Sequence, residues 1–399
     1  MLRGMDDFPA QLLAQSLKVP PHIALVTETW PPEINGVAMT LSRLAHGLSM
    51  RGWKVTLVRP RQRVESTDQH DHILVPGLPI PGYAGLRFGL PVRNTLLRLW
   101  TKQRPDVVHI ATEGPLGWAA LKVAKKLQLP ITSSFHTNFH RYCRHYRLGS
   151  IRRSVERYLR DFHNQASCTM TPNEALSQSL RQEGYRNVHT VGRGIDAELF
   201  NPRHRSEALR KQWGVTPDDL VVIHVGRIAA EKNLQAAADT FDQIVLTQPN
   251  AKMVWVGDGP QLKSISKRYP NHIFTGSKLG LELAEHYASA DMFLFPSMTE
   301  TFGNVVLEAM SSGLAVVAYR YAAAETYISD GKSGLLAEFG DLQQFQQQAK
   351  SLTGNLRAIR SVGASARKAI EDQPWDEVCM KFESLLQAAV KGEALCLTA

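Results

Sequence analysis

The 399-residue sequence contains only four cysteines and no long apolar run. Both features restrict the classes of protein to which it can belong. The cysteines show no Cys-x-x-Cys spacing, so neither a disulfide framework nor a zinc site is indicated, and free thiols in a reducing cytosol are expected. No stretch approaches the roughly 18 apolar residues of a membrane span. Asp6, Asp7 and Pro9 interrupt the first residues, which therefore do not resemble a signal peptide. We expect a cytoplasmic protein.

Several site motifs are also missing. No Gly-x-Gly-x-x-Gly follows the first predicted strand, which argues against a dinucleotide-dependent oxidoreductase. The sequence has no Asp-x-Asp motif and no His/Cys cluster with zinc-like spacing, so it makes no case for a divalent metal or another cofactor. No nucleic-acid recognition module or aromatic stacking motif is found. We therefore expect no cofactor, no metal and no nucleic-acid partner.

Short apolar segments alternate with helical segments along the whole chain. Strands are predicted near residues 22–27, 54–59, 106–110, 130–135, 167–171, 188–191, 220–226, 252–256, 272–275, 291–295 and 315–319. The helices between them include 40–51, 118–127, 235–247 and 281–289. Such alternation predicts parallel sheets covered on both faces, and the length favours two domains. The segment Gly192–Pro202, rich in turn formers, is predicted to link them.

The segment from Glu300 to Glu308 places two carboxylates on either side of a glycine. A short apolar strand precedes it and stops at Pro296, and a helix is predicted from Asn304 to Ser311. The turn between them would present unpaired N–H groups at the positive end of a helix, which favours a phosphate or another anion. The two carboxylates suit paired sugar hydroxyls. Alternatively, Glu300 caps the helix and Glu308 is a solvated helix residue.

A second motif follows the strand predicted at residues 220–226. Gly226 and Arg227 end this strand, and Lys232 lies in the loop before the next helix. Ligands of open α/β sheets bind outside the carboxyl ends of the strands, where both cations would lie. With the helix N-terminus after Gly303 they would form a pyrophosphate clamp, each charge-assisted contact contributing roughly 1.5–3 kcal/mol. The alternative is an ordinary surface loop.

Two further motifs lie in the first half of the chain. The segment after the first strand contains Asn35 and Gly36, and Gly36 permits a close approach of the backbone to a ligand. A Pro-stiffened turn is the alternative here. His136 ends a strand in Ser-Ser-Phe-His-Thr, on the side where a ligand cleft is expected. A lone histidine after a strand is, however, more often structural.

In this order, the motifs resemble those of the retaining GT-B glycosyltransferases of family 4. The resemblance extends from about His22 to about Glu383, and the pairing of Gly226–Lys232 with Glu300–Glu308 is its most specific part. Within the family, the first half is most similar to bacterial GDP-mannose-dependent α-mannosyltransferases and to sulfolipid synthases. Three segments carry this closer match: Thr27–Val37, Glu113–Trp118 and Ser134–Phe139.

The resemblance implies a GT-B fold: two facing Rossmann-like domains, at residues 1–194 and 195–370, with a helix in 371–399 that crosses back onto the first. Trp375 would anchor that helix. The catalytic group would comprise His136, Arg227, Lys232 and Glu300. The substrate-binding residues would be Asn35, Gly36, Phe302, Gly303, Asn304, Val305 and Glu308.

The resemblance also implies how these residues divide the work. The two cations would neutralise the departing diphosphate, and such stabilisation of developing charge is usually a large catalytic term. Glu308 would bind the ribose, while Glu300 and the backbone of the following turn would hold the hexose and pyrophosphate. Gly36 would close over the phosphate from the first domain. His136 would contact the sugar donor or the acceptor, without acting as a general base.

The implied reaction transfers a hexose from a nucleoside-diphosphate sugar, GDP-mannose or a UDP-hexose, to an acceptor with retention of configuration. A membrane lipid or glycolipid is the expected acceptor. A sugar-nucleotide epimerase of GT-B shape, or a transferase acting on a soluble or polysaccharide acceptor, is the alternative.

Basic residues are concentrated in the first half of the chain. Residues 1–200 hold 26 Lys and Arg against 15 Asp and Glu, and seven of these arginines lie between residues 141 and 160. Apolar residues follow helical spacing on the other side of this segment: Ile151, Val155, Tyr158, Leu159 and Phe162. The pattern suits a helix that docks peripherally on an anionic membrane surface. The alternative is an ordinary amphipathic helix whose apolar stripe faces the core.

Overall fold

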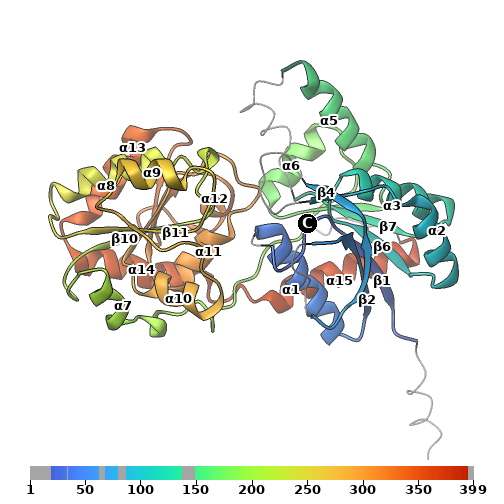
Figure 1. Cartoon of the computed structure of the whole chain (residues 1–399), viewed down its shortest axis with the longest axis horizontal. Helices are drawn as coiled ribbons and strands as arrows, with labels where there is room; N and C mark the ends of the chain where they lie inside the picture. Colours follow the sequence, from blue (N-terminus) through green and yellow to red (C-terminus); the bar gives the residue numbers. More distant parts are fainter. Residues whose placement is uncertain (1–18, 34, 63–67, 80–86, 137–148, 394–399) are drawn as a thin grey trace, which may run out of the picture.

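The computed structural model describes residues 19–33, 35–62, 68–79, 87–136 and 149–393, and within them the chain forms two lobes (Figure 1). Each lobe is built on one parallel sheet covered by helices. The strand order is β3-β2-β1-β6-β7-β8-β9 in the first sheet and β12-β11-β10-β13-β14-β15 in the second. The prediction of two Rossmann-like α/β domains is confirmed.

Every predicted strand is present. The first sheet comprises β1 (His22–Val26), β2 (Lys54–Pro60), β3 (Asp71–Val75), β6 (Val107–Ile110), β7 (Ile131–Ser134), β8 (Cys168–Thr171) and β9 (Val188–Thr190). The second comprises β10 (Val221–Val225), β11 (Lys252–Val256), β12 (Ile273–Phe274), β13 (Met292–Phe295), β14 (Ala315–Tyr319) and β15 (Leu335–Ala337). An antiparallel pair, β4 (Gly77–Pro79) and β5 (Arg87–Gly89), lies beside the first sheet. The strands β3, β4, β5 and β15 were not predicted.

Helices connect the strands and cover both faces of each sheet. Those of the first lobe are α1 (Gly36–Met50), α2 (Arg93–Lys102), α3 (Pro115–Lys126), α5 (Gly149–His163) and α6 (Glu174–Gln182). Those of the second are α7 (Glu207–Gln212), α8 (Leu234–Val245), α9 (Leu262–Arg268), α10 (Gly280–Ala288), α11 (Asn304–Ser311), α12 (Ala322–Tyr327), α13 (Leu342–Thr353) and α14 (Leu356–Ile370). Short 3₁₀ turns, η1 (Pro202–His204) and η2 (Ala230–Lys232), lie in the loops, and α15 (Trp375–Lys391) follows α14.

The strand order reverses once in each sheet, between β1 and β6 in the first and between β10 and β13 in the second. At such a switch point the loops after the two central strands diverge and leave room for a ligand. The predicted site residues lie mostly on these loops: Asn35 and Gly36 follow β1, Arg227 and Lys232 follow β10, and the Glu300 turn follows β13. Sheet topology therefore collects these motifs at one edge of each sheet.

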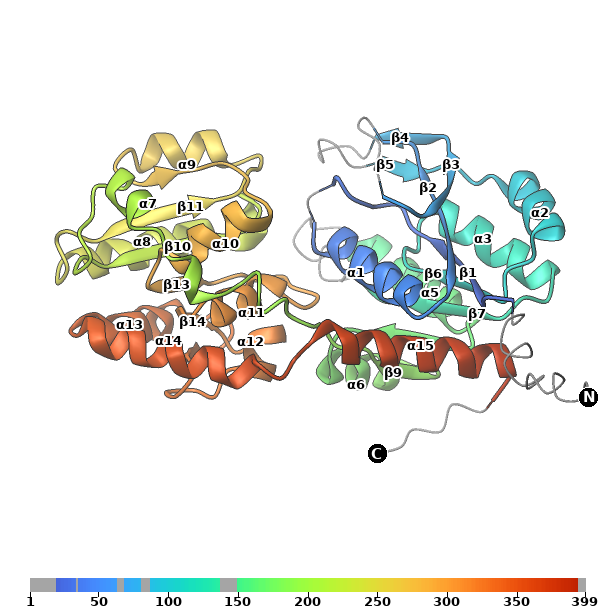
Figure 2. The same ribbon diagram turned by 90° about the horizontal axis from the view of Figure 1, so that it is seen from below.

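The helix α15 crosses from the second lobe to the first, as Figure 2 shows. Its apolar face enters the core of the first lobe through Cys379, Phe382 and Leu386, each no more than 2% exposed. Trp53 Nε1 donates to Glu383 Oε1 over 2.9 Å, which adds a polar contact beside that core. The crossover helix expected from the sequence is confirmed. The domain boundaries at residues 194 and 370 stay predictions.

Trp375 lies where the chain crosses between the lobes. A Cβ atom at Gly194 would lie 2.5 Å from the Trp375 backbone, so the linker and the start of α15 run in close contact. Ile195 N donates to Gln373 O over 2.8 Å in the same place. The two crossing segments are thus joined to each other.

Within the described ranges, no helix combines the length and the apolar composition needed to cross a lipid bilayer.

Candidate active site

The loop that carries Arg227 is held by a close backbone approach. Gly257, after β11, has φ +140°, and a Cβ atom there would lie 1.9 Å from the carbonyl oxygen of Gly226. Ile228 N donates to Asp258 O over 2.9 Å, so the loops after β10 and β11 are packed together. Arg227 Nη1 lies 3.4 Å from Glu231 Oε1, and about a third of the Arg227 side chain is exposed. A guanidinium that is paired with Glu231 therefore lies at the carboxyl end of β10.

Lys232 and Glu300 form an ion pair through Lys232 Nζ and Glu300 Oε1. Both side chains are largely buried, with 15% and 13% of their surfaces exposed. Ser297 Oγ donates to the same Glu300 oxygen over 2.6 Å, and the Tyr321 hydroxyl donates to the Glu300 carbonyl oxygen over 2.6 Å. The two predicted catalytic residues therefore meet, and their positions are fixed by neutral donors around them.

The turn after Glu300 leads into the N-terminus of α11. Gly303 is the N-cap residue, with φ +92°, a conformation that an L side chain rarely adopts. It has no side chain to cap the helix, so the N–H groups of Asn304 and Val305 lack both an intrahelical acceptor and a side-chain cap. Phe302 is buried just before the turn. This end of α11 can receive an anion, as the sequence predicts.

Glu308 is half-buried inside α11 and faces a different partner. The hydroxyl of Tyr287, on α10, donates to Glu308 Oε2 over 3.0 Å. Burial raises the pKa of Glu308 to about 7, although the Tyr287 hydrogen bond opposes this effect. Burial and the neighbouring carboxylate raise the pKa of Tyr287 well above its usual value, so Tyr287 stays a donor. Ionised Glu308 would accept hydroxyl donors from a ligand more strongly than the acid.

The first lobe contributes the N-terminus of a second helix. A Cβ atom at Gly36, the first residue of α1, would lie 3.6 Å from Asn304 Nδ2 of α11. The first residues of α1 and α11 therefore approach each other across the boundary between the lobes. Two helix dipoles that converge in this way favour a negatively charged group between them.

The side chain of Asn35 is occupied. Its Oδ1 accepts from Ala38 N over 2.9 Å and caps α1, while its Nδ2 donates to Thr29 Oγ1 over 2.6 Å. The side chain of Asn35 thus caps α1, and its predicted contact with substrate stays a prediction.

His136 follows β7 and is 7% exposed. Arg193, in the linker, donates from Nη2 to His136 Nδ1 over 3.1 Å. Burial first, and then the charge of Arg193, hold the pKa of His136 well below its usual value. The Arg193 guanidinium carbon also lies 5.8 Å from the ring centroid of Phe302, just before the anion-binding turn. Asn173 Nδ2 adds a hydrogen bond to Thr301 O over 3.2 Å. The predicted histidine is thus connected to the turn in the other lobe.

The first lobe also places two carboxylates after its central strands, Glu28 after β1 and Glu113 after β6. Glu28 Oε1 accepts from Leu116 N at the start of α3 over 3.3 Å. Burial raises the pKa of Glu28 to about 7, and the charge of Glu113 adds to this effect. Glu113 is buried and lies 3.1 Å from His163 Nε2. Sequence reasoning quoted both glutamates within motifs but selected neither as a site residue.

Other contributors were not predicted, because their role depends on side-chain contacts that form only in the folded chain. They are Arg193, which holds His136; Tyr287, which holds Glu308; Ser297 and Tyr321, which hold Glu300; and Asn173, which reaches Thr301. One sequence signal was present: Arg193 stands between two glycines directly after the last strand of the first sheet.

The basic segment is only partly described. Asn138 and the arginines at positions 141, 144 and 147 lie outside the described residues. In α5, Leu159 and Phe162 are at most 2% exposed and pack into the first lobe, while Arg153 and Arg157 are exposed. The Leu159–Phe162 part of the apolar stripe therefore faces the core, as the alternative interpretation expects, and Arg153 and Arg157 face solvent.

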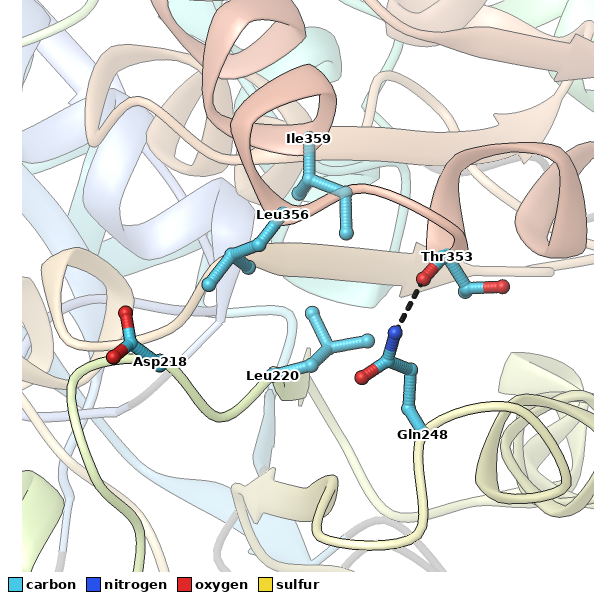
Figure 3. Close-up of a pocket in the computed structure, with 6 residues that line it drawn as sticks. All are labelled: Asp218, Leu220, Gln248, Thr353, Leu356 and Ile359. Atoms are coloured by element: carbon cyan, nitrogen blue, oxygen red, sulfur yellow. Dashed lines mark hydrogen bonds between the residues drawn. The ribbon is translucent and has the colours of Figure 1, made fainter.

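A separate pocket lies in the second lobe (Figure 3). It is lined by Asp218, Leu220, Gln248, Thr353, Leu356 and Ile359. Gln248 Nε2 donates to Thr353 O over 2.6 Å and closes one side. Leu220 immediately precedes β10, so this pocket lies at the opposite edge of the sheet from Arg227 and Lys232. We assign it no ligand.

Among the described residues, no group of three or more His, Cys, Asp or Glu side chains is arranged to hold a metal ion. The expectation of a metal-free reaction stays a prediction.

Comparison with known proteins gives consistent matches. A model of Glycosyltransferase Family 4 matches residues 34–199, and one of Glycosyl transferases group 1 matches residues 219–355. The chain is 30% identical to the GDP-mannose-dependent alpha-mannosyltransferase of Mycolicibacterium smegmatis, over 94% of this chain and 99% of that protein. It is 30% identical to sulfoquinovosyl transferase SQD2 of Arabidopsis thaliana, over 95% and 76% of the two chains. It is 28% identical to alpha-monoglucosyldiacylglycerol synthase of Streptococcus pneumoniae, over 79% and 75%.

Solved structures agree on the fold. Sucrose-phosphate synthase from Thermosynechococcus elongatus superposes with a TM-score of 0.75 at 17% identity, over 94% of this chain and all of that one. Anabaena HepE, in complex with UDP and glucose, superposes with a TM-score of 0.74 at 18% identity, over 92% and 100%. Identities this low support the architecture alone, and the GT-B fold expected from the sequence is confirmed.

Proposed function

The chain belongs to the family 4 glycosyltransferases, and from this we propose that it is a retaining hexosyltransferase that uses a nucleoside-diphosphate sugar and glycosylates a membrane lipid. GDP-mannose is the first candidate donor, because the mycobacterial relative of 30% identity is named for it. A UDP-hexose is the second. The lipid acceptor is supported by the name of the Streptococcus relative, alpha-monoglucosyldiacylglycerol synthase.

One observation carries the donor proposal: the N-termini of α1 and α11 meet beside a lysine. The distance of 3.6 Å between a Cβ atom at Gly36 and Asn304 Nδ2 brings both helix ends to one place. Lys232, through Glu300, is tied to the turn that begins α11. A diphosphate bound there would receive backbone N–H groups from both lobes and a cation, with each charge-assisted contact worth roughly 1.5–3 kcal/mol.

The ion pair of Lys232 with Glu300 suggests how the free site is kept neutral. Without a ligand, Glu300 balances the lysine charge and fixes its position. A bound diphosphate would share the lysine, and the freed capacity of the carboxylate would accept hydroxyl groups of the hexose. As the glycosidic bond breaks, negative charge develops on the leaving diphosphate, where Lys232, Arg227 and the end of α11 stabilise it.

Retention of configuration is supported by what surrounds the predicted catalytic residues. His136 Nδ1 already accepts from Arg193, and burial together with that cation opposes proton uptake by the ring. Glu300 is held by Lys232 and Ser297, so it is not arranged as a free nucleophile. Neither side chain is therefore arranged to act as a general base or as a nucleophile. We therefore infer that the acceptor attacks on the leaving-group face and that the departing phosphate takes its proton.

Membrane docking is proposed as an electrostatic contact. The apolar stripe of α5 is used in the core, but Arg153 and Arg157 remain exposed on a lobe with a surplus of basic residues. Each basic residue near an anionic surface contributes about 1 kcal/mol, and salt screens it within about 8–10 Å. Docking of this kind would be reversible and would bring the acceptor to the first lobe.

A two-step assay tests the proposal. Thermal shift with a panel of nucleotide sugars identifies the donor, because a ligand at 100 times its dissociation constant stabilises the folded state by about 2.7 kcal/mol. Transfer to diacylglycerol in anionic vesicles is then followed by NMR of the anomeric proton. We expect GDP-mannose to bind most tightly and the product to be the α-anomer. A β-linked product refutes retention, and transfer to soluble sugars alone refutes the lipid acceptor.

Two variants test the division of roles between the carboxylates. Glu308→Ala is expected to weaken binding of the free nucleoside diphosphate, because the ribose contact is lost. Glu300→Ala is expected to spare that binding and to impair use of the complete sugar donor. Calorimetry with the nucleoside diphosphate separates the two, and equal losses in both variants would show that the assignment is wrong. Interconversion of the donor sugar without transfer would instead identify an epimerase.

A further inference from the structure

Arg193 is a buried cation that has no carboxylate partner among the described residues. It is 5% exposed, and its Nη1 donates to the carbonyl oxygens of Val191 over 3.2 Å and Gly192 over 2.9 Å. Its Nη2 donates to His136 Nδ1 over 3.1 Å. Burial of an arginine is costly unless its donors are satisfied, so this placement needs a reason beyond packing.

The contact with Arg193 decides which nitrogen of His136 carries the proton. A guanidinium has donors only, so His136 Nδ1 must accept. A neutral imidazole that accepts at Nδ1 carries its proton on Nε2. His136 Nε2 is itself buried and has no hydrogen-bond partner within the described part of the chain. The ring therefore offers one fixed donor that lacks an acceptor in the free protein.

We propose that Arg193 is a positioning residue that fixes His136 as an Nε2–H donor for an oxygen of the transferred sugar. The inference rests on the proposed function, since it is the sugar that supplies the missing acceptor. Buried donors are rarely left unpaired, and a ligand oxygen would satisfy this one. A hydroxyl or ring oxygen of a hexose has the required acceptor lone pairs.

The charged and titratable groups around His136 keep the donor in this state. Burial is the largest cause that keeps the pKa of His136 low, and Arg193 from the linker, His109 from β6 and His163 from α5 each further oppose a positive charge on the ring. The carboxylate of Glu113 is paired with His163 rather than with His136. The ring therefore stays neutral through the pH range in which an exposed histidine would titrate, and Nε2–H is present throughout.

Arg193 also connects this donor to the anion-binding turn. Its guanidinium carbon lies 5.8 Å from the ring centroid of Phe302, which precedes Gly303 and the start of α11. The same side chain thus contacts His136 in the first lobe and Phe302 in the second.

Nitrogen-15 NMR of histidine-labelled protein tests the tautomer in the free enzyme. His136 is assigned by the signals that disappear in His136→Gln, and the protonated and unprotonated ring nitrogens are distinguished by their shifts. We expect the proton on Nε2 alone, with no titration between about pH 5.5 and pH 8. A proton on Nδ1, a mixture of tautomers or an imidazolium in this range would overturn the inference. This NMR measurement does not require a variant of Arg193.

Variants then test the role of Arg193 in transfer. Arg193→Met is expected to mix the tautomers of His136 and to lower kcat/KM roughly tenfold or more, the scale of one hydrogen bond. Binding of the nucleoside diphosphate should stay within about twofold, and Arg193→Lys should recover part of the tautomer signal. Arg186→Met, at an exposed position of the same lobe, is the matched control. An Arg193→Met enzyme that keeps both the single tautomer and full kcat/KM would overturn the inference.

Replacement of His136 gives a second, independent test of the Nε2–H donor. In His136→Gln the amide nitrogen can take the place of Nε2–H, whereas in His136→Asn it reaches only the position of Nδ1. We expect the glutamine variant to retain at least about tenfold more turnover than the asparagine variant. The reverse order would overturn the inference. Failure of the wild type to bind any nucleoside diphosphate, with the tautomer as expected, would refute the proposed function and leave the Arg193 contact with His136 supported.

Discussion

Glu308 is expected to destabilise the free protein at neutral pH, and Glu308→Gln should reveal this. Burial raises the pKa of Glu308 from 4.5 to about 7. Between these values the folded state holds a proton that the unfolded state has released, so the free energy of unfolding falls as the pH rises through this window. The cost is absent below about pH 4.5 and fully present above about pH 7.

The size of the effect follows from the shift. Each pKa unit corresponds to about 1.36 kcal/mol, so the ionised carboxylate costs up to about 3 kcal/mol in the folded state. Glutamine cannot ionise, and its carbonyl oxygen can still accept from Tyr287. Glu308→Gln should therefore match the wild type at about pH 4 and be more stable by up to about 3 kcal/mol at about pH 8.

Binding should change in the opposite direction. A carboxylate accepts ribose hydroxyls more strongly than an amide, and a hydrogen bond to a charged group contributes about 1.5–3 kcal/mol. We expect Glu308→Gln to bind the nucleoside diphosphate roughly 10–100-fold more weakly at about pH 8, where its stability gain is largest. The protein would thus retain a stability cost because the ionised group serves the ligand.

The assay is urea or thermal unfolding at both pH values, followed through the transition of the second domain because the two lobes need not unfold together. Calorimetry with the nucleoside diphosphate is run on the same samples. Glu371→Gln, an exposed carboxylate of the same lobe, is the matched control. An equal stability difference at both pH values would refute the burial argument, and unchanged nucleotide affinity would refute the ribose contact.

Three further predictions concern the clamp, the turn and the membrane. Lys232→Ala should lower turnover roughly 10²–10³-fold, as for loss of one stabiliser of developing charge, and near wild-type kcat would remove the pyrophosphate assignment. Gly303→Ala should destabilise the protein by about 1 kcal/mol, because φ is +92°, and should weaken nucleotide binding; calorimetry that finds unchanged affinity contradicts the anion site. Arg153→Glu with Arg157→Glu should reduce sedimentation with anionic vesicles at least about tenfold while donor hydrolysis in solution persists. Equal sedimentation of the wild type with neutral vesicles would exclude electrostatic docking.

Much of the fold follows from local pattern. The central strands, such as β10 with all five residues buried, read as continuous apolar runs because both faces of a parallel sheet are covered. Two of the missed strands, β4 and β5, lack this signal, while β15 is fully buried but only three residues long. β4 and β5 have three residues each and gain their order from pairing with each other, which a single segment of sequence does not reveal.

The candidate site, like the fold, has one part that local sequence motifs reveal and another part that they do not. Gly303 and Lys232 were predicted because each lies in a strand–loop–helix motif whose chemistry is local. The partners of the two glutamates come from other elements: Tyr321 donates to the Glu300 carbonyl oxygen, and Tyr287 determines the environment of Glu308. Such contacts form only when distant elements pack, so the pKa of Glu308 and the tautomer of His136 could not be predicted from spacing.

The crossover helix α15 has a consequence for the order of biosynthesis. Its residues Cys379, Phe382 and Leu386 complete the core of the first lobe, yet they are translated only after the whole second sheet. The first lobe therefore emerges from the ribosome with an open apolar groove beside α1, while the second lobe can close its own core earlier. Until α15 is synthesised, chaperones can bind this groove, or another apolar segment can pack there wrongly. The lobe whose synthesis begins first is therefore the last to complete its core.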